Sequence, residues 1–415
     1  MSRLRFCMVT TFYPPYNFGG DGIGIQRFSQ ALTRRGHEVT VLQDVDAHNV
    51  LRTGPEPSAS AEPDGVEVVR LRSRARALSV LLTQQTGLPV LNRGAVRRFF
   101  HERRFDVINY HNISLIGGPG VLAYGDAVKL YMAHDHWLVC PTHVLWRHKR
   151  ELCQGRECVR CSLSYRRPPQ LWRHTGYLEH QLRHVDAVIA MSEFSRQKHR
   201  EFGLGRDMEV VNYFLPERPL AVSAAGSPHE RPYFLFAGRL EKIKGLDDVI
   251  PLFARYQGAD LLVAGDGEYA AVLRELAKGI DRVKFLGRID SGKLDRYYHH
   301  ALALIVPSVC FETFGIILIE AFRQGTPVLA RRLGPFPEIV ERARGGLLFD
   351  GPGELLESMR RIQADPSLRA SLSASALEGF ARHWTENAVM PRYLEVVKRA
   401  AQMRERTEVV RALES

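Results

Sequence analysis

The amino-acid sequence predicts an α/β protein with two doubly wound domains, each built on a mostly parallel sheet. Three observations predict this fold class: strand-length apolar runs alternate with helix-like segments, the alternation continues along the whole chain, and one polar break divides it. The chain has 415 residues, of which 45% are hydrophobic and 25% are charged. This composition is ordinary for a globular protein with two or three domains.

The apolar runs are short and apolar almost throughout, as expected for strands buried on both faces of a parallel sheet. In the first half of the chain they are residues 6–10, 39–42, 66–71, 107–110, 128–133 and 187–191. In the second half they are residues 233–237, 259–264, 283–285, 302–306 and 327–330. The segments between them have helical character, so the chain predicts repeated strand–helix units.

The polar break covers residues 215–232, which are rich in Pro, Ala and Ser. It predicts a first domain over residues 1–215 and a second over residues 216–387. Residues 388–415 predict a charged helical tail that crosses back to the first domain, and residues 44–65 predict a loop. For two doubly wound domains we expect a ligand in a central cleft, at the carboxyl ends of the strands.

The net charge of +11 is concentrated in the first half of the sequence. Residues 1–215 contain 29 Lys and Arg against 20 Asp and Glu, whereas the other 200 residues contain 28 against 26. This excess indicates either an anionic partner, such as a phospholipid surface, a phosphorylated acceptor or a nucleic acid, or a solvated basic surface.

The sequence contains no apolar stretch of the ~18 residues that a membrane span requires. Its first residues read as a strand and not as a signal peptide. We therefore expect a cytoplasmic protein, with peripheral contact to the inner membrane face as an option.

Two glycine-containing turns follow predicted strands and are candidate phosphate sites. Gly19 and Gly20 precede a helical segment, where backbone N–H groups can approach a phosphate. Arg239 and Lys244 follow the strand over residues 233–237 and precede a predicted helix over residues 246–255. Cations beside a helix start suit a diphosphate. The alternatives are tight packing for the glycines and a solvated basic turn for the cations.

Two glutamates, Glu312 and Glu320, are separated by seven residues in the segment ETFGIILIE. A helix beginning at Gly315 would leave Glu312 in the preceding loop and place Glu320 more than one turn inside an apolar helix. A carboxylate in such surroundings needs polar partners, and sugar or ribose hydroxyls would serve. The loop N–H groups would point at a ligand at the helix start. The alternative is a surface glutamate with an ordinary ion pair.

Four of the six cysteines fall within 22 residues, with the spacing C-x12-C-x4-C-x2-C. Cys140, Cys153, Cys158 and Cys161 predict a tentative structural zinc site in an insertion over residues 140–161. Neighbouring arginines would favour thiolates. Another metal or cluster, redox-active thiols and free thiols remain open.

Taken together and in this order, the motifs resemble those of the retaining glycosyltransferases of sequence family 4, which have the two-domain GT-B fold. The resemblance rests on the E-x7-E pair, on Arg239 and Lys244 in GRLEKIKG, on the early glycine loop and on Gly36-His37. It extends from residue 5 to about residue 400. A subset of that family has a similar cysteine-bearing insertion.

The resemblance implies a role for each matching residue. The family's active-site histidine corresponds to His134, which follows the strand over residues 128–133, with His111 as a weaker candidate and His136 as a neighbour that could be mistaken for it. The implied catalytic set is His134, Glu312, Arg239 and Lys244. The implied donor-binding set is Gly19, Gly20, Arg239, Lys244, Arg288, Ile289, Glu312, Phe314, Gly315, Ile316 and Glu320.

The resemblance also implies the reaction. A sugar would move from a nucleotide-diphosphate sugar to an acceptor hydroxyl of a glycan, a glycolipid or a small molecule, with retention of configuration and without a catalytic metal or other cofactor. The acceptor could be lipid-linked or anionic, and no nucleic acid is expected as a partner. The alternative functions are a nucleotide-sugar epimerase and a basic membrane- or nucleic-acid-binding protein on the same scaffold.

Overall fold

The computed structural model describes residues 3–52, 57, 65–218 and 226–414. Its contacts divide the chain into two compact units. Unit 1 consists of residues 1–212 together with Val389–Ser415, and unit 2 is Tyr213–Ala388. The sequence predicts a boundary after residue 215 and a separate tail over residues 388–415. In the structure the chain divides after Asn212, and the last 27 residues belong with the first unit.

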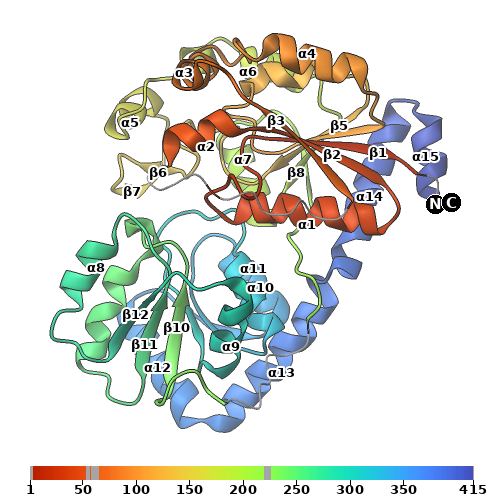
Figure 1. The fold of residues 1–415 in the computed structure, drawn as a ribbon. Helices are drawn as coiled ribbons and strands as arrows, with labels where there is room; N and C mark the ends of the chain where they lie inside the picture. Colours follow the sequence, from red (N-terminus) through yellow and green to blue (C-terminus); the bar gives the residue numbers. More distant parts are fainter. Residues whose placement is uncertain (1–2, 53–56, 58–64, 219–225, 415) are drawn as a thin grey trace. The chain divides into compact units, whose positions relative to one another are not determined.

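Unit 1 is built on a parallel seven-stranded sheet (Figure 1) with the strand order β3-β2-β1-β4-β5-β8-β9. The strands are β1 (Arg5–Thr10), β2 (Glu38–Asp44), β3 (Val66–Leu71), β4 (Val107–Tyr110), β5 (Val128–Ala133), β8 (Ala187–Ala190) and β9 (Met208–Val210). Every residue of β4 and β5 is buried, as the continuous apolar runs predict. In the central register, Val9 lies opposite Leu42 on one side and Tyr110 on the other.

Helices cover both faces of this sheet. They are α1 (Gly20–Arg34), α2 (Val45–Leu51), α3 (Arg76–Thr86), α4 (Arg93–Glu102), α5 (Cys158–Ser164), α6 (Tyr177–Leu182) and α7 (Glu193–Glu201), with the 3-10 helices η1 (Gly118–Ala123) and η2 (Leu171–His174). On one face, Val96 and Phe99 of α4 and Leu178 of α6 join the core cluster of the strands. A small antiparallel pair, β6 (Trp146–Arg147) and β7 (Glu151–Leu152), lies in the cysteine-bearing segment.

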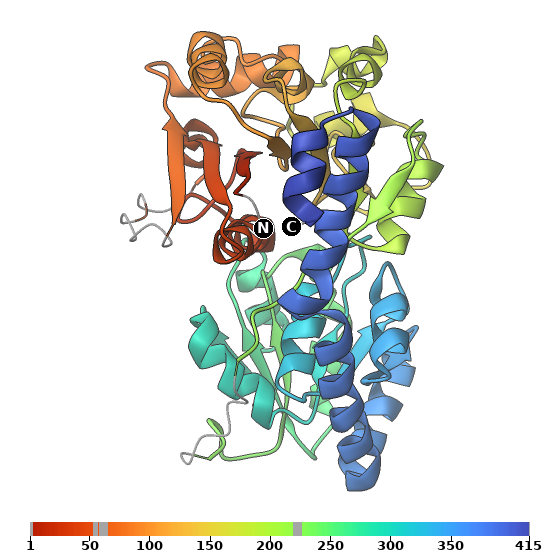
Figure 2. The same cartoon turned by 90° about the vertical axis from the view of Figure 1, so that its right-hand side faces the viewer.

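The carboxyl-terminal helices α14 (Glu386–Met403) and α15 (Thr407–Glu414) complete unit 1 and lie side by side (Figure 2). Lys398 and Glu414 join them by an ion pair of 2.8 Å. Tyr393 of α14 is fully buried, contacts the ring of Phe28 in α1 and accepts a hydrogen bond of 3.2 Å from the Asn109 amide of β4. The C-terminal segment is therefore part of the core of unit 1.

Unit 2 is built on a parallel six-stranded sheet with the order β12-β11-β10-β13-β14-β15. The strands are β10 (Tyr233–Ala237), β11 (Asp260–Ala264), β12 (Val283–Gly287), β13 (Leu304–Val306), β14 (Val328–Arg331) and β15 (Gly346–Phe349). The helices are α8 (Ala270–Leu276), α9 (Ser291–His300), α10 (Ile316–Arg323), α11 (Phe336–Ala343), α12 (Pro352–Ala364) and α13 (Pro366–His383), with the 3-10 helices η3 (Lys242–Lys244), η4 (Leu246–Asp248) and η5 (Ile250–Ala254).

Two local predictions are wrong. The predicted loop over residues 44–65 begins with α2, because the Asp44 carboxylate caps this helix by accepting a hydrogen bond from the Asp46 N–H at 2.8 Å. The predicted helix over residues 246–255 is instead the pair η4 and η5. Pro251 lacks an N–H group and cannot continue an α-helical ladder there. The sequence pattern also does not reveal β9 and β15, which are short.

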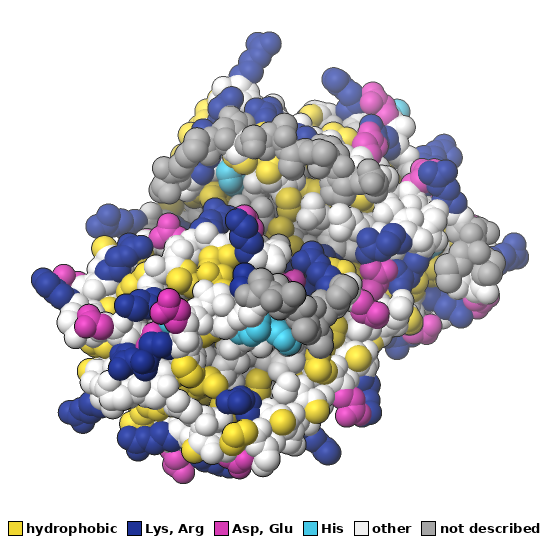
Figure 3. Space-filling view, turned by 60° about the horizontal axis from the view of Figure 1, so that its bottom comes forward, with side chains coloured by type: hydrophobic (Ala, Val, Ile, Leu, Met, Phe, Trp, Pro, Cys, Tyr) yellow, Lys and Arg dark blue, Asp and Glu magenta, His cyan; other side chains and the backbone are white. Residues whose placement is uncertain are grey.

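The surface mixes charges of both signs on the face drawn in Figure 3, where Lys and Arg side chains are interspersed with Asp and Glu. Within the described ranges, no helix combines the length and the apolar character needed to cross a membrane.

The packing of Tyr393 predicts a large effect of its removal. Tyr393→Ala opens a cavity in the core of unit 1, so we expect the free energy of unfolding to fall by about 3–5 kcal/mol. The matched control is Arg392→Ala in the same helix: Arg392 is exposed, and its change should stay within about 0.5 kcal/mol. Thermal unfolding followed by circular dichroism measures both, and equal melting temperatures for the two variants would contradict this role of Tyr393.

Candidate functional site

In each sheet, the chain first adds strands on one side of the first strand and then adds strands on its other side, so the direction of growth reverses there. In unit 2 the chain adds β11 and β12 on one side of β10 and then adds β13, β14 and β15 on the other. In unit 1 it adds β2 and β3 on one side of β1 and then β4 and the later strands on the other. Loops that follow the two strands at such a point turn away from each other, which leaves a crevice at the carboxyl ends of the strands. In unit 2 this point lies between β10 and β13.

The loop after β10 is shaped by two glycines. Gly238 has φ 153° and Gly245 has φ 72°, both outside the range that other residues favour. A Cβ atom on Gly245 would lie 2.1 Å from the carbonyl oxygen of Pro307, which follows β13. The loop after β10 therefore contacts the loop after β13, and this contact places Lys244 beside the loop that follows β13.

Lys244 and Glu312 form an ion pair across this point, with 2.5 Å between Nζ and Oε1. Ser308 donates a hydrogen bond of 3.1 Å to the same carboxylate oxygen. Both charged side chains are largely buried, with 20% and 25% exposed. Burial alone would raise the pKa of Glu312, but the Lys244 cation, its hydrogen bond and the Ser308 hydroxyl together lower it. Burial would likewise lower the pKa of Lys244, but Glu312 raises it. Both groups are therefore charged at neutral pH.

Arg239 lies in the same loop and is the more accessible cation. Its side chain is 56% exposed and pairs with Glu241 at 2.7 Å. Arg239 also lowers the pKa of Lys244 and Glu312 through its charge, which places it within electrostatic range of the pair. Arg288 and Ile289 follow β12 at the same edge of the sheet, and Arg288 is exposed. Arg239 and Arg288 are thus exposed cations at the carboxyl edge of the sheet, where a diphosphate could pair with them.

The second glutamate lies where the sequence predicts it. The helix α10 begins at Ile316, with Gly315 as its N-cap residue, so Glu312 lies in the preceding loop and Glu320 lies inside the helix. Glu320 accepts a hydrogen bond of 3.2 Å from the Tyr298 hydroxyl of α9. Phe314 is buried, and Gly315 and Ile316 are half-buried. Sequence reasoning missed Tyr298, because nothing in the spacing of α9 distinguishes this residue from a core tyrosine.

In unit 1, the glycine pair lies at the start of a helix that follows β1. Gly19 is the N-cap residue of α1, and Gly20 is its first residue. The Asn17 side-chain amide donates a hydrogen bond of 2.9 Å to the Gly19 carbonyl. Gly20 is exposed and Gly19 is half-buried. The backbone N–H groups of this first turn have no partners within the helix, as is general for helix starts.

Two histidines follow neighbouring strands of unit 1 and contact each other. His111 follows β4, His134 follows β5, and their Nδ1 and Nε2 atoms are 2.8 Å apart. The other ring nitrogen of His111 lies 3.3 Å from the sulfur atom of Met8. Burial lowers the pKa of His134 to about 4 and lowers that of His111 well below its ordinary value. Both rings are therefore neutral at neutral pH, and His111, the weaker candidate from the sequence, is the direct partner of His134.

The residues after His134 are held by a separate set of contacts. Asp135 pairs with His143 at 2.7 Å and accepts a hydrogen bond of 2.8 Å from the Trp137 N–H. His136 is buried, and its ring lies 5.2 Å from that of His199. Burial would raise the pKa of Asp135, but His143 and the Trp137 N–H lower it. This network positions the backbone that follows His134.

The tentative zinc site is not supported by the structure. Among the described residues, no group of three or more His, Cys, Asp or Glu side chains could hold a metal ion. The thiols of three of the cysteines have separate local partners: Cys140 contacts the Thr142 hydroxyl, Cys153 donates to the Gly155 carbonyl, and Cys161 accepts from the His148 N–H. Burial raises the pKa of Cys153, Cys158 and Cys161, and for Cys158 and Cys161 it outweighs the lowering effect of nearby arginines. The structure therefore does not support the expected thiolates, and all four cysteines are free.

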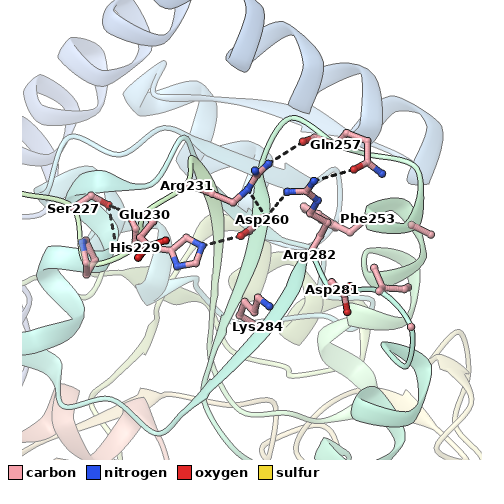
Figure 4. Close-up of a pocket in the computed structure, with 14 residues that line it drawn as sticks. Ser227, His229, Glu230, Arg231, Phe253, Gln257, Asp260, Asp281, Arg282 and Lys284 are labelled. Atoms are coloured by element: carbon pink, nitrogen blue, oxygen red, sulfur yellow. Dashed lines mark hydrogen bonds and ion pairs between the residues drawn. The ribbon is translucent and has the colours of Figure 1, made fainter.

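A cavity of about 780 Å³ lies elsewhere in unit 2 (Figure 4). Its lining residues lie in η5, in the segments that precede β10, β11 and β12, and within the first two positions of β11 and β12. The cavity therefore lies at the amino ends of the strands, away from Lys244 and Glu312. Asp260 lies at its centre, is almost fully buried, and pairs with His229 at 2.8 Å, Arg231 at 3.2 Å and Arg282 at 3.4 Å. None of the donor-binding residues that the sequence predicts lines this cavity, so it is not the predicted donor site.

Comparison with known proteins assigns both halves of the chain to sugar-transfer enzymes. Two solved structures share its fold at low identity: sucrose-phosphate synthase from Thermosynechococcus elongatus and HepE from Anabaena in complex with UDP. The first has a TM-score of 0.72 and 19% identity, and the match covers 98% of this chain and 99% of that one. The second has a TM-score of 0.66 and 17% identity, covering 95% and 99%. The protein therefore has the α/β GT-B fold of two Rossmann-like domains.

Residues 18–213 match the family model Glycosyltransferase Family 4, and residues 218–378 match the model Glycosyl transferases group 1. The chain is therefore a glycosyltransferase similar to those of family 4. A curated relative is the lipopolysaccharide core biosynthesis glycosyltransferase LpsE of Rhizobium meliloti, 28% identical over 223 residues, which are 52% of this chain and 65% of that protein. These matches do not favour the epimerase or the binding-protein interpretation.

The ion pair predicts how stability responds to pH. Because the folded pKa of Glu312 is lowered, its stabilising contribution is present above its ordinary value of 4.5 and is lost as the pH falls through the folded value. In the Lys244→Met variant, burial is the largest remaining influence on the Glu312 carboxyl group, and burial raises the pKa of this group. The variant therefore loses stability as the pH rises. We expect its deficit against the wild type to grow by about 1–3 kcal/mol between about pH 4 and about pH 7.

Denaturant unfolding at the two pH values measures this deficit. Lys242→Met is the matched control, because Lys242 is an exposed lysine in the same loop. A deficit for Lys244→Met that is constant across the range would contradict the electrostatic role of the pair.

Proposed function

We propose that this glycosyltransferase uses a nucleotide-diphosphate sugar as its donor and binds it at the carboxyl edge of the unit 2 sheet. The observation that carries the proposal is the Lys244–Glu312 pair at the point between β10 and β13, with Arg239 in electrostatic range. Two cations at such an edge suit the two phosphates of a donor. HepE, a protein with the same fold, binds UDP in its crystal structure, and this ligand supports a nucleotide donor here.

Different residues at this edge would bind different parts of the donor. We assign the diphosphate to Arg239 and Lys244, and the ribose hydroxyls to Glu320. The transferred sugar would be bound by Glu312 and by the N–H groups of Phe314, Gly315 and Ile316, and the base would lie near Arg288 and Ile289. In unit 1, the N–H groups of Gly19 and Gly20 would approach the phosphates, and the neutral His134 imidazole would bind a sugar hydroxyl, held in position by His111.

The pairing of Lys244 with Glu312 fits this assignment for two reasons. Glu312 keeps Lys244 protonated in spite of its burial, so the cation is present before the donor arrives. The carboxylate also has a second oxygen and can accept hydrogen bonds from sugar hydroxyls while it holds the lysine. A cation that is already charged and positioned needs little reorganisation when the diphosphate leaves.

The proposed reaction is a front-face substitution with retention of configuration. The bond between the anomeric carbon and the diphosphate oxygen breaks, and the bond to the acceptor oxygen forms on the same face of the sugar. The acceptor hydroxyl gives its proton to the departing diphosphate, and Arg239 and Lys244 stabilise the negative charge that develops there. These cations take the role that a metal would have, so the proposed transfer needs no catalytic metal. The acceptor would be a hydroxyl of a glycan, a glycolipid or a small molecule.

Two substitutions separate the parts of the donor. Arg239→Gln removes a charged contact to the diphosphate, and we expect about tenfold or greater loss of affinity for UDP or GDP, with the affinity for the free nucleoside unchanged. Glu320→Gln removes the ribose contact, and we expect it to lower the affinity for the nucleoside and the affinity for UDP or GDP by similar factors. Isothermal titration measures all four affinities, with Lys242→Gln as the control for a general loss of positive charge. Equal effects of Arg239→Gln on nucleoside and diphosphate would overturn the assignment.

The stereochemistry has its own test. With a donor of α configuration, front-face substitution gives an α-linked product, and proton NMR of the first product formed distinguishes the two anomers by their coupling constants. A β-linked product would exclude the proposed mechanism while leaving the donor site intact.

A further inference from the structure

The cavity at the amino ends of the unit 2 strands has the dimensions of a ligand site. Its volume of about 780 Å³ falls in the range of small-molecule sites, which enclose roughly 300–1,000 Å³. Its lining residues come from three separate parts of the chain: residues 227–231, 253–260 and 279–284. Cationic and anionic side chains both line it, so a ligand would be recognised mainly by charge and hydrogen bonds (Figure 4).

A buried carboxylate fixes the cations at the centre of this cavity. Asp260 has only 4% of its side chain exposed, and its carboxylate pairs with three side chains: His229, Arg231 and Arg282. Gln257 holds both arginines from a second side. Its backbone carbonyl accepts a hydrogen bond of 3.1 Å from Arg231, and its side-chain oxygen accepts one of 3.0 Å from Arg282. The two guanidinium groups are therefore held in position before any ligand binds.

The centre of the cavity has more positive than negative charge. Burial would raise the pKa of Asp260, but His229 and the two arginines lower it, so this carboxylate contributes one negative charge. Two arginines face it, and the exposed Lys284 lines the same cavity. Each guanidinium has five N–H groups and uses two of them in its contacts with described residues. The other N–H groups and the Lys284 ammonium group suit the oxygens of a phosphate.

Two exposed acidic side chains and a hydroxyl line the same cavity. Glu230 precedes β10, Asp281 precedes β12, and Ser227 lies three residues before Glu230. Carboxylates accept hydrogen bonds from hydroxyl groups, but they repel further negative charge. A nucleic acid or an inorganic polyphosphate would bring such charge past the arginines. The lining therefore favours a ligand with one anionic group and an uncharged body rich in hydroxyl groups.

We propose that this cavity is a binding site for a sugar phosphate. The phosphate would lie against Arg231, Arg282 and Lys284, and hydroxyl groups of the sugar would donate hydrogen bonds to Glu230 and Asp281. The site lies at the opposite end of the strands from the donor site proposed above, and none of its residues takes part in donor binding there. A sugar phosphate and a nucleotide could therefore occupy unit 2 at the same time.

Isothermal titration of the full chain with mannose 6-phosphate tests the proposal. The titration is made in the presence of saturating UDP, so that a nucleotide occupies the donor site as proposed above. Inorganic phosphate and mannose are titrated in parallel. We expect mannose 6-phosphate to bind at least about tenfold more tightly than inorganic phosphate, because its hydroxyl groups add hydrogen bonds to charged carboxylates. Mannose, which lacks the anionic group, should show no measurable binding.

Substitutions in the two parts of the cavity should have different effects. Lys284→Gln and Arg231→Gln should each weaken binding of mannose 6-phosphate about tenfold, since each removes a charged contact to the phosphate. Lys284 is exposed, so its substitution should leave the melting temperature unchanged even if Arg231→Gln, which removes a partner of Asp260, lowers it. Glu230→Ala with Asp281→Ala should weaken mannose 6-phosphate but not inorganic phosphate.

The matched control is Lys242→Gln, because Lys242 is an exposed lysine of unit 2 that lies outside the cavity. This variant should bind mannose 6-phosphate as the wild type does. Three results would overturn the proposal: no binding of mannose 6-phosphate by the wild type, equal affinities of the wild type for mannose 6-phosphate and inorganic phosphate, or binding that Lys284→Gln leaves unchanged. Each can occur whether or not UDP binds at the donor site, so the two proposals fail separately.

Discussion

The ion pair between Lys244 and Glu312 depends on a contact of the backbone that only glycine allows. Gly245 brings the loop after β10 against the Pro307 carbonyl after β13, and a side chain at this position would collide with that oxygen. The contact places a buried cation and a buried carboxylate together at the point where the sheet reverses its direction of growth. Each of these charges would be costly to bury alone. The loop geometry and the electrostatics of this edge therefore depend on each other.

The same edge explains why Arg239 and Lys244 are not equivalent. Lys244 is largely buried, and its carboxylate partner holds it in one place. Arg239 is more than half exposed, and its partner Glu241 lies in the same loop. A buried lysine is a fixed point charge, whereas an exposed arginine can change its partner and bind two oxygens at once. In the proposed donor complex, Lys244 would contribute a charge already in position and Arg239 would move from Glu241 to the phosphates.

The sheets could be predicted from the sequence because parallel strands buried on both faces are continuous apolar runs. Val66–Leu71, Val107–Tyr110, Val128–Ala133 and Tyr233–Ala237 have the predicted bounds. The errors arise where one local interaction decides the backbone, as with the Asp44 cap of α2 and with Pro251 in η5. At the candidate site, cations and glutamates stand out by type and spacing. Tyr298 does not, because its contact with Glu320 depends on how α9 packs on α10. The cysteines differ from these residues: their spacing predicts a metal site that the structure does not support, and three of the thiols contact separate local partners.

Burial gives the two units different chemistry at the carboxyl ends of their sheets. In unit 2, burial is opposed by a partner of opposite charge, so Lys244 and Glu312 remain ionised. In unit 1, the partner of the buried His134 is a second buried histidine. A positive charge on one ring disfavours a positive charge on the other, so the pairing does not favour protonation of both rings. The pair is therefore neutral, and its rings can donate or accept hydrogen bonds without adding charge. Neutral rings suit the recognition of sugar hydroxyls, whereas the charge of a departing diphosphate requires the cations of unit 2.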